Sequence, residues 1–135
     1  MKKIFRFLAV IFIISNCVLH AQWVQTNIPS GAKVNAIVSA PNGSGGANLF
    51  AGTLTGGVFL STNNGTNWTA VNNGLTRYDI YSLSVSPDGS KLFAGTGGVG
   101  MFLSTNNGTS WTSVSDGLTN GFTRDIRAIL FNGKN

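Results

Sequence analysis

Two loops of this sequence place carboxylates beside arginines, the residue types and spacing best suited to chemistry. Asp79 lies two positions after Arg77, and Asp125 directly follows Arg124. Glycoside hydrolysis needs such a pair of carboxylates, one acting as acid and the other as base or nucleophile. The alternative is that each aspartate pairs with its neighbouring arginine at the surface, a common and weakly coupled arrangement. We favour the ion pairs and keep Asp79 and Asp125 as the catalytic alternative.

The same two loops also carry aromatic side chains. Tyr78 and Phe122 could stack on a sugar ring, and Arg77 and Arg124 complete the candidate binding set. Loops that a rigid scaffold positions are where binding residues concentrate. The alternative for the two aromatic residues is that they cover the edge of the core.

An eight-residue stretch that occurs twice organises the chain around these loops. Residues 61–68 read STNNGTNW and residues 104–111 read STNNGTSW, so the two copies start 43 residues apart. The same offset relates Phe50 to Phe93 and Phe59 to Phe102. A period in this range indicates supersecondary units that stack against one another.

Short apolar, β-branched and aromatic runs flank each copy and predict strands. We expect four strands in each unit: 34–39, 48–53, 57–62 and 68–71, then 80–86, 91–96, 100–105 and 111–114. Four antiparallel strands in about 40–45 residues are typical of a propeller blade. The sequence therefore predicts an all-β chain with one blade at 34–75, a second at 80–118, and the first strand of a third within 126–135.

Asn-Gly between two apolar runs is the strongest local signal for a hairpin. We expect Gly65 and Gly108 to adopt a positive φ, which glycine does without a steric clash. Asn63 and Asn106 are expected to accept hydrogen bonds from amides two residues on. The tryptophan that ends each stretch should pack its hairpin onto its own sheet.

The repeated stretch resembles the Asp-box, Ser-x-Asp-x-Gly-x-x-Trp, of bacterial neuraminidase (BNR) repeats. It matches at the serine, glycine and tryptophan, and departs at the third position, where asparagine replaces aspartate. The corresponding residues are Ser61, Asn63, Gly65 and Trp68, and again Ser104, Asn106, Gly108 and Trp111. In such families the box is a structural turn away from the active site. The resemblance, which covers residues 23–131, therefore implies a β-propeller and no particular activity.

Residues 1–21 have the pattern of a helical secretory signal peptide. Three basic residues precede the apolar run 7–14, and Ala21 offers a cleavage point. That run is too short to span a membrane, which takes about 20 residues. We expect a secreted protein, extracellular or periplasmic, without a membrane span. A lipoprotein modified at Cys17 is the alternative.

Removal of the signal peptide changes which reactive and charged side chains the protein retains. The only cysteine and the only histidine leave with it, which excludes disulfides and His/Cys metal sites, and we expect no metal and no cofactor. The net charge falls from +5 to +2, because six basic residues then face four aspartates. No basic cluster remains, so nucleic acid is not an expected partner.

Residues 22–30 resemble the last strand of each unit without the three strands that should precede it. We expect this lone strand to close a ring. The remaining propeller blades would then follow in the same longer chain, of which this sequence is an N-terminal fragment.

The sequence predicts a secreted, non-catalytic β-propeller segment that serves as a binding or scaffold module for a protein or glycan. It resembles the BNR-repeat proteins that bacteria export. One alternative is a fragment of a sialidase- or xyloglucanase-type glycoside hydrolase. Another is an assembly factor of the photosystem-stability type, since fold alone does not decide function.

Overall fold

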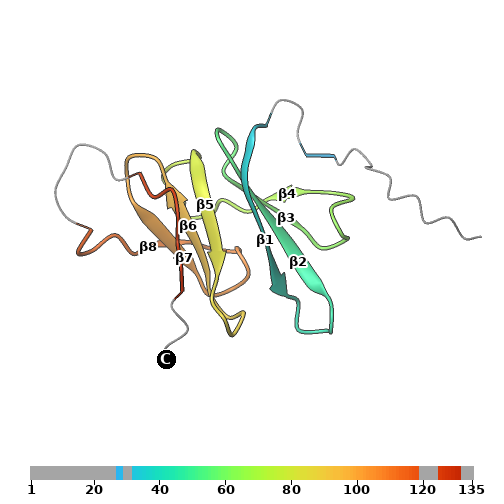
Figure 1. Ribbon diagram of the computed structural model, residues 1–135. Coiled ribbons are helices and arrows are strands. Elements are labelled where there is room, and N and C mark those ends of the chain that lie inside the picture. Colours follow the sequence, from blue (N-terminus) through green and yellow to red (C-terminus); the bar gives the residue numbers. More distant parts are fainter. Residues whose placement is uncertain (1–26, 29–31, 119–124, 132–135) are drawn as a thin grey trace, which may run out of the picture.

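The computed structural model describes residues 27–28, 32–118 and 125–131, and this part of the chain is all-β (Figure 1). The first antiparallel sheet contains β1 (Val34–Pro41), β2 (Ala47–Thr53), β3 (Val58–Ser61) and β4 (Thr69–Ala70). The second contains β5 (Ile80–Val85), β6 (Leu92–Thr96), β7 (Met101–Ser104) and β8 (Thr112–Ser113). The all-β prediction is confirmed. The expected signal peptide at 1–21 lies outside the described residues, and so does most of the segment 22–30.

Each sheet has its strands in chain order, so every strand pairs with its neighbour in the sequence. The registers of the two sheets correspond: Ile37 lies opposite Ala51 in the first, and Leu83 lies opposite Ala94 in the second. Both first strands also carry an irregularity near their start, between Val34 and Ala36 and between Ile80 and Ser82. The sequence repeat is therefore also a structural repeat.

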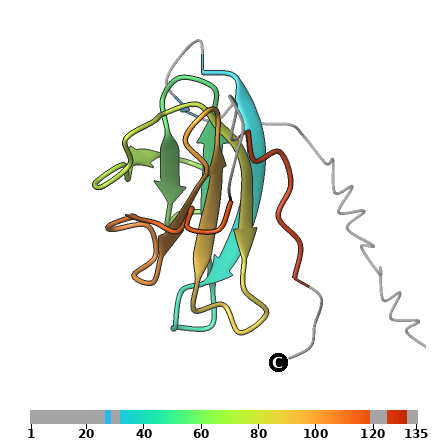
Figure 2. The same cartoon turned by 90° about the vertical axis from the view of Figure 1, so that its left-hand side faces the viewer.

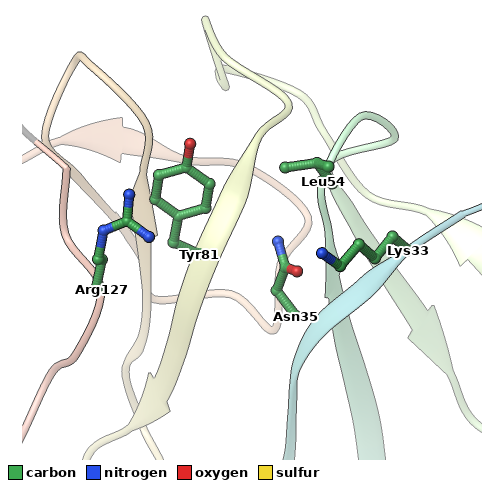
Figure 3. A pocket seen from close by; sticks show the side chains of 5 residues that line it. All are labelled: Lys33, Asn35, Leu54, Tyr81 and Arg127. Atoms are coloured by element: carbon green, nitrogen blue, oxygen red, sulfur yellow. The ribbon is translucent and has the colours of Figure 1, made fainter.

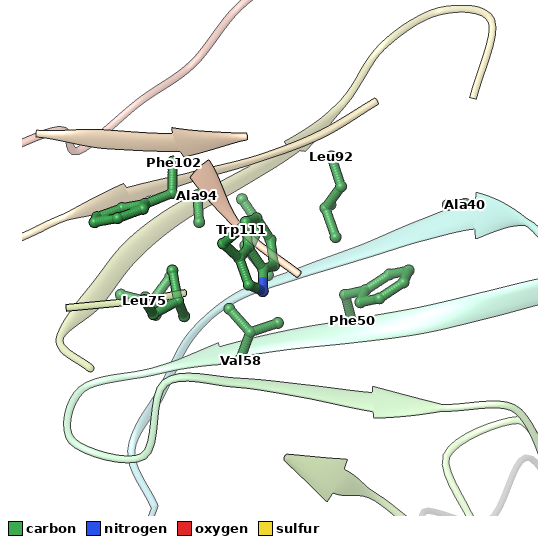
Figure 4. Packing of buried hydrophobic residues seen from close by; sticks show 10 residues of the cluster. Ala40, Phe50, Val58, Leu75, Leu92, Ala94, Phe102 and Trp111 are labelled. Carbon is green, nitrogen blue, oxygen red and sulfur yellow. The ribbon is translucent and has the colours of Figure 1, made fainter. Parts of the chain in front are cut away.

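The core lies between the two sheets, which pack face to face. Figure 2 shows the second sheet in front of the first. Phe50 and Val58 of the first sheet are fully buried, as is Ile80 of the second (Figure 4 shows the cluster). Gly52 allows a close approach of the two sheets, because a side chain there would meet Ile80 and Leu83. Burial of apolar surface between the sheets thus holds the two units together.

Equivalent apolar positions in the two sheets differ in burial. Leu83 is 8% exposed, because it faces the first sheet. Ile37 occupies the same position of β1 but is 60% exposed. Its neighbours Ala36 and Val38 pack into the core, so alternation along the strand turns Ile37 away from the second sheet.

The outer strands β4 and β8 are two residues long, shorter than the predicted 68–71 and 111–114. The predicted strands began at the tryptophans, but Trp111 donates its amide hydrogen to the carbonyl oxygen of Asn73, at 2.9 Å. That amide therefore bonds the preceding unit and takes no part in the strand pairing of its own sheet.

Residues 126–131 form no strand, in contrast to the prediction. The amide of Ile126 donates to the carbonyl oxygen of Thr96 at 3.1 Å, and the ring of Phe131 lies 5.4 Å from that of Phe93. The segment thus lies against the second sheet, visible in red in Figure 1. A ladder requires a strand alongside, and none of the described strands pairs with these residues.

Candidate functional site

The first copy of the repeated stretch is a turn held by its own side chains. The Ser61 hydroxyl accepts a hydrogen bond from the amide of Gly65 at 2.8 Å and donates to Oδ1 of Asn63 at 3.0 Å. The same Oδ1 accepts from the amide of Asn67 at 2.9 Å. We had expected Asn63 to bond an amide two residues on; it reaches four residues on, because the serine hydroxyl takes the nearer amides.

The second copy repeats this geometry. Ser104 accepts from the amide of Gly108 at 2.9 Å, and Oδ1 of Asn106 accepts from the amide of Ser110 at 2.9 Å. Gly65 and Gly108 adopt φ values of +84° and +79°, as expected for this hairpin. The side-chain acceptors of both turns, a serine hydroxyl and an asparagine amide oxygen, carry no charge. None of the described residues forms a cluster of three or more metal-ligating side chains.

The two tryptophans have different surroundings. Trp111 is 4% exposed and donates from Nε1 to the carbonyl oxygen of Val71, at 2.7 Å. Its indole nitrogen thus bonds the preceding unit, while its ring belongs to the core cluster that both sheets line, with Val58 of the first sheet and Phe102 of the second (Figure 4). Trp68 is half-buried, and its Nε1 donates to Gly65 within the same turn at 3.1 Å. The side chain that the sequence assigned to one hairpin therefore links two units.

Asp79 forms the expected ion pair. Arg77 donates to both of its carboxylate oxygens, from Nε at 3.1 Å and from a terminal nitrogen at 3.2 Å. The hydrogen bond and the charge of Asp79 raise the pKa of Arg77 above its ordinary value. Tyr78, between them, is 51% exposed and covers no core in the described part of the chain.

Asp125 has a different partner from the one that the sequence suggested. Its Oδ2 lies 3.0 Å from a terminal nitrogen of Arg127, and its Oδ1 accepts from the amide of Gly98 at 3.0 Å. Arg124 and Phe122 lie outside the described residues. The carbonyl oxygen of Asp79 accepts from the amide of Gly97, at 3.0 Å. The structure therefore brings both aspartates to the Gly97–Gly98 turn.

A groove between β1 and β5 is the site that the sequence did not indicate. It has a volume of about 390 Å³ and is lined by Lys33, Asn35, Leu54, Tyr81 and Arg127. In Figure 3, Lys33, Asn35 and Leu54 form one wall, and Tyr81 and Arg127 form the other. The Arg127 guanidinium carbon lies 4.7 Å from the centre of the Tyr81 ring, a cation–π contact. The site thus combines two cations, a phenol and a carboxamide.

Three of these groove residues share one position of the repeat. Asn35, Tyr81 and Arg127 follow one another at intervals of 46 residues, each directly after an apolar residue. The carboxamide of Asn35 donates from Nδ2 to the carbonyl oxygen of Ile80, at 2.8 Å, and so links β1 to β5. Their spacing was visible in the sequence. It differs from the 43-residue interval of the turns, however, and the difference hid the correspondence.

No family model, curated protein or solved structure matches this chain. Within the described ranges, no helix is long and apolar enough to cross a membrane.

Proposed function

We propose that this chain is a secreted β-propeller segment of the BNR-repeat kind that binds a protein or glycan partner without catalysing a reaction. The observation that carries the proposal is the groove in which Asn35, Tyr81 and Arg127 meet. Equivalent residues of successive repeats come together where innermost strands surround a common axis, as the blades of a propeller do. The two sheets would then be the blades at 34–75 and 80–118, with a third beginning at 126.

The position of Asn27 supports the same arrangement. Asn27 forms a bridge with Asn67, the residue before Trp68. One repeat later, Asn73 accepts a hydrogen bond from the amide of Trp111. Asn27, which precedes β1, therefore contacts the turn at 61–68 in much the same way as Asn73, at the end of the first unit, contacts the turn at 104–111. This favours residues 22–30 as the outer strand of another blade.

The ion pairs favour binding over catalysis. Both carboxylate oxygens of Asp79 are bound by Arg77. Those of Asp125 are bound by Arg127 and by the amide of Gly98. A glycoside hydrolase needs one carboxylic acid ready to protonate the leaving group. Neither carboxylate has an oxygen without a donor, so the pair is better suited to shaping the loops beside the groove.

One observation favours the glycoside hydrolase alternative. Asp79 and Asp125 both contact the turn at Gly97–Gly98, so two carboxylates lie beside the same loop. If they act on a glycosidic bond, Asp79→Asn and Asp125→Asn should each abolish hydrolysis while glycan binding remains.

The experiment that tests the proposal is a binding screen of the full chain against immobilised glycans and proteins, with product analysis of each ligand that binds. We expect a ligand to be retained unchanged, and Tyr81→Ala to reduce that binding while the far-ultraviolet circular dichroism stays the same. Exposed Thr112 on the outer strand β8 offers a matched control, since Thr112→Ala changes a residue outside the groove. Turnover of the bound ligand, or equal binding by Tyr81→Ala, would contradict the proposal.

A further inference from the structure

We infer that Asn42 is a modification site, at which the side-chain amide is converted to a carboxylic acid through a cyclic imide formed with the backbone nitrogen of Gly43. The conversion consumes water and needs no enzyme. Asn42 lies in the connection 42–46 between β1 and β2, outside the groove, so the modification does not depend on what the groove binds.

The chemistry starts from the pair of residues Asn-Gly. The backbone nitrogen of the glycine attacks Cγ of the asparagine, and the absence of a glycine side chain leaves the approach open. A bond forms between that nitrogen and Cγ, the nitrogen loses its proton, and the side-chain nitrogen leaves as ammonia. Water then opens the ring at either of its two carbonyl groups, which gives aspartate or isoaspartate. The described part of the chain holds such pairs at 42–43, 64–65, 73–74 and 107–108.

The carboxamide of Asn42 is activated for this attack. Its Oδ1 accepts hydrogen bonds from the Ser44 amide and the Ser44 hydroxyl, both at 3.0 Å, and from the Gly46 amide at 2.9 Å. Donors around a carbonyl oxygen stabilise the negative charge that develops there when a nucleophile adds to the carbon. The bond to Ser44 also folds the side chain back over the intervening residue, which is Gly43. The three donors therefore favour attack by the neighbouring nitrogen.

The nucleophile at Gly43 is free to react. Among the described residues, none accepts a hydrogen bond from the Gly43 amide. A side chain at Gly43 would meet nothing within 4 Å, and every residue from Pro41 to Ala47 is exposed. The amide can thus move toward Cγ without breaking a contact, and water can reach the ring that forms.

The Asn-Gly pairs of the repeated stretch are protected. The Gly65 amide donates to the Ser61 hydroxyl at 2.8 Å, and the Gly108 amide donates to the Ser104 hydroxyl at 2.9 Å. Both hydroxyls belong to buried residues. The nucleophile must first break a buried hydrogen bond, which slows the attack by about tenfold or more.

The pair at Asn73 and Gly74 is restrained by the second unit. The carbonyl oxygen of Asn73 accepts from the Trp111 amide at 2.9 Å, and a side chain at Gly74 would collide with the Trp111 backbone. Closing the imide ring requires this backbone to rotate. The rotation would break contacts between the two units, so the fold opposes the reaction here as well.

The second repeat shows that the turn accommodates the aspartate product. Residues 41–44 read PNGS and residues 87–90 read PDGS, so Asp88 occupies the place of Asn42. Oδ1 of Asp88 accepts from the Ser90 amide at 3.1 Å, and its Oδ2 accepts from the Ser90 hydroxyl at 2.7 Å. Ser44 offers the same two donors at position 42. An aspartate formed there keeps its turn, and the negative charge that it adds meets two hydrogen-bond donors.

The test is to incubate the full chain at mildly alkaline pH, folded and in guanidinium chloride, and to follow each Asn-Gly pair by peptide mapping with mass spectrometry. In the folded protein we expect Asn42 to convert about tenfold or more faster than Asn64 and Asn107. In denaturant the three rates should become similar, because the dipeptide is the same. Ser44→Ala removes one donor to Oδ1 and should slow Asn42 about three- to tenfold. Ser90→Ala, at the equivalent serine of the second repeat, is the matched control and should leave that rate unchanged.

Three outcomes would overturn the inference. One is conversion of Asn42 in the folded protein at or below the rates of Asn64 and Asn107. Another is an equal advantage for Asn42 in denaturant, which would trace its reactivity to the local sequence and not to the turn. The third is aspartate without isoaspartate at position 42, since direct hydrolysis by water yields aspartate alone. Unchanged circular dichroism of the two serine variants shows that their rates are those of the folded protein.

Discussion

Gly74 and Gly117 occupy the same position of the two repeats but have different neighbours. Both have a positive φ, +90° and +82°. A side chain at Gly74 would collide with the backbone carbonyl of Trp111, whereas nothing lies within 4 Å of one at Gly117. We expect Gly117→Ala to cost only the strain of the left-handed backbone, about 1–2 kcal/mol, and Gly74→Ala to cost distinctly more. Denaturant unfolding of both variants measures the difference. Equal losses would show that the sheets do not pack as closely here as described.

Asp88 gives the protein a defined response to acid. Hydrogen bonds from Ser86 and Ser90 lower the pKa of its carboxyl from 3.8 to about 2. Since the folded pKa lies below the unfolded one, the stabilisation is present above pH 3.8 and is lost as the pH falls toward 2. The difference in stability between the wild type and Asp88→Asn should therefore shrink across that window. Denaturant unfolding at a series of pH values measures it, and a carboxyl titration with its midpoint near 3.8 would contradict the expectation.

Sequence reasoning at the residue scale succeeded where contacts are local. The positive φ of Gly65 and Gly108 and the pairing of Arg77 with Asp79 follow from residues a few positions apart. It did not indicate the hydrogen bond of Trp111, whose acceptor Val71 lies 40 residues away. Nothing in the repeated stretch indicates which sheet the indole contacts, because that depends on how the units pack.

At the scale of the strands, Leu83 and Ile37 form a matched pair. They occupy the same position of β5 and β1, yet Leu83 is buried and Ile37 is exposed. Leu83→Ala should destabilise the protein by about 2–5 kcal/mol through the cavity left between the sheets. Ile37→Ala should cost about 1 kcal/mol or less, as surface substitutions do. Thermal unfolding compares the two. A large loss for Ile37→Ala would mean that something covers β1 from the other side.

The strands were predictable because their signals lie within the strands themselves. The ends of β1 to β3 and of β5 to β7 fall within two residues of the expected ones. Residues 126–131 carry the same apolar signal but form no strand, since a ladder also needs a partner alongside. That requirement cannot be found in the six residues themselves.

At the scale of the whole molecule, the first sheet exposes one large apolar side chain to solvent, that of Ile37. It lies on β1, an edge strand, and exposed sheet edges with apolar side chains promote association. We expect the protein to self-associate at high concentration and Ile37→Lys to weaken that association without loss of stability. Sedimentation velocity over a concentration series measures it. Thr112→Lys on β8 adds the same charge to the other sheet, and if it were equally effective, net charge and not this face would be responsible.

The groove is also a property of the whole molecule, which explains why the sequence did not point to it. Its residues Asn35, Tyr81 and Arg127 lie far apart in the chain, and none of them alone marks a site. The first strands recur after 46 residues and the turns after 43, because the hairpin of β1 and β2 is longer, with both strands counted, than that of β5 and β6. Only the packed units show which positions face each other.

The strand order within each sheet also determines when each part of the structure forms. Every strand pairs with its neighbour in the chain. Closing the short loops between them costs little entropy, so each sheet can assemble early. Contacts between sheets span more of the chain and come later. Docking of Trp111 onto Val71 should then be the slow kinetic phase, which stopped-flow fluorescence of a Trp23→Phe/Trp68→Phe double variant would follow through Trp111 alone. A chain built in this way folds one unit at a time, and each unit completes its own sheet before the two sheets dock.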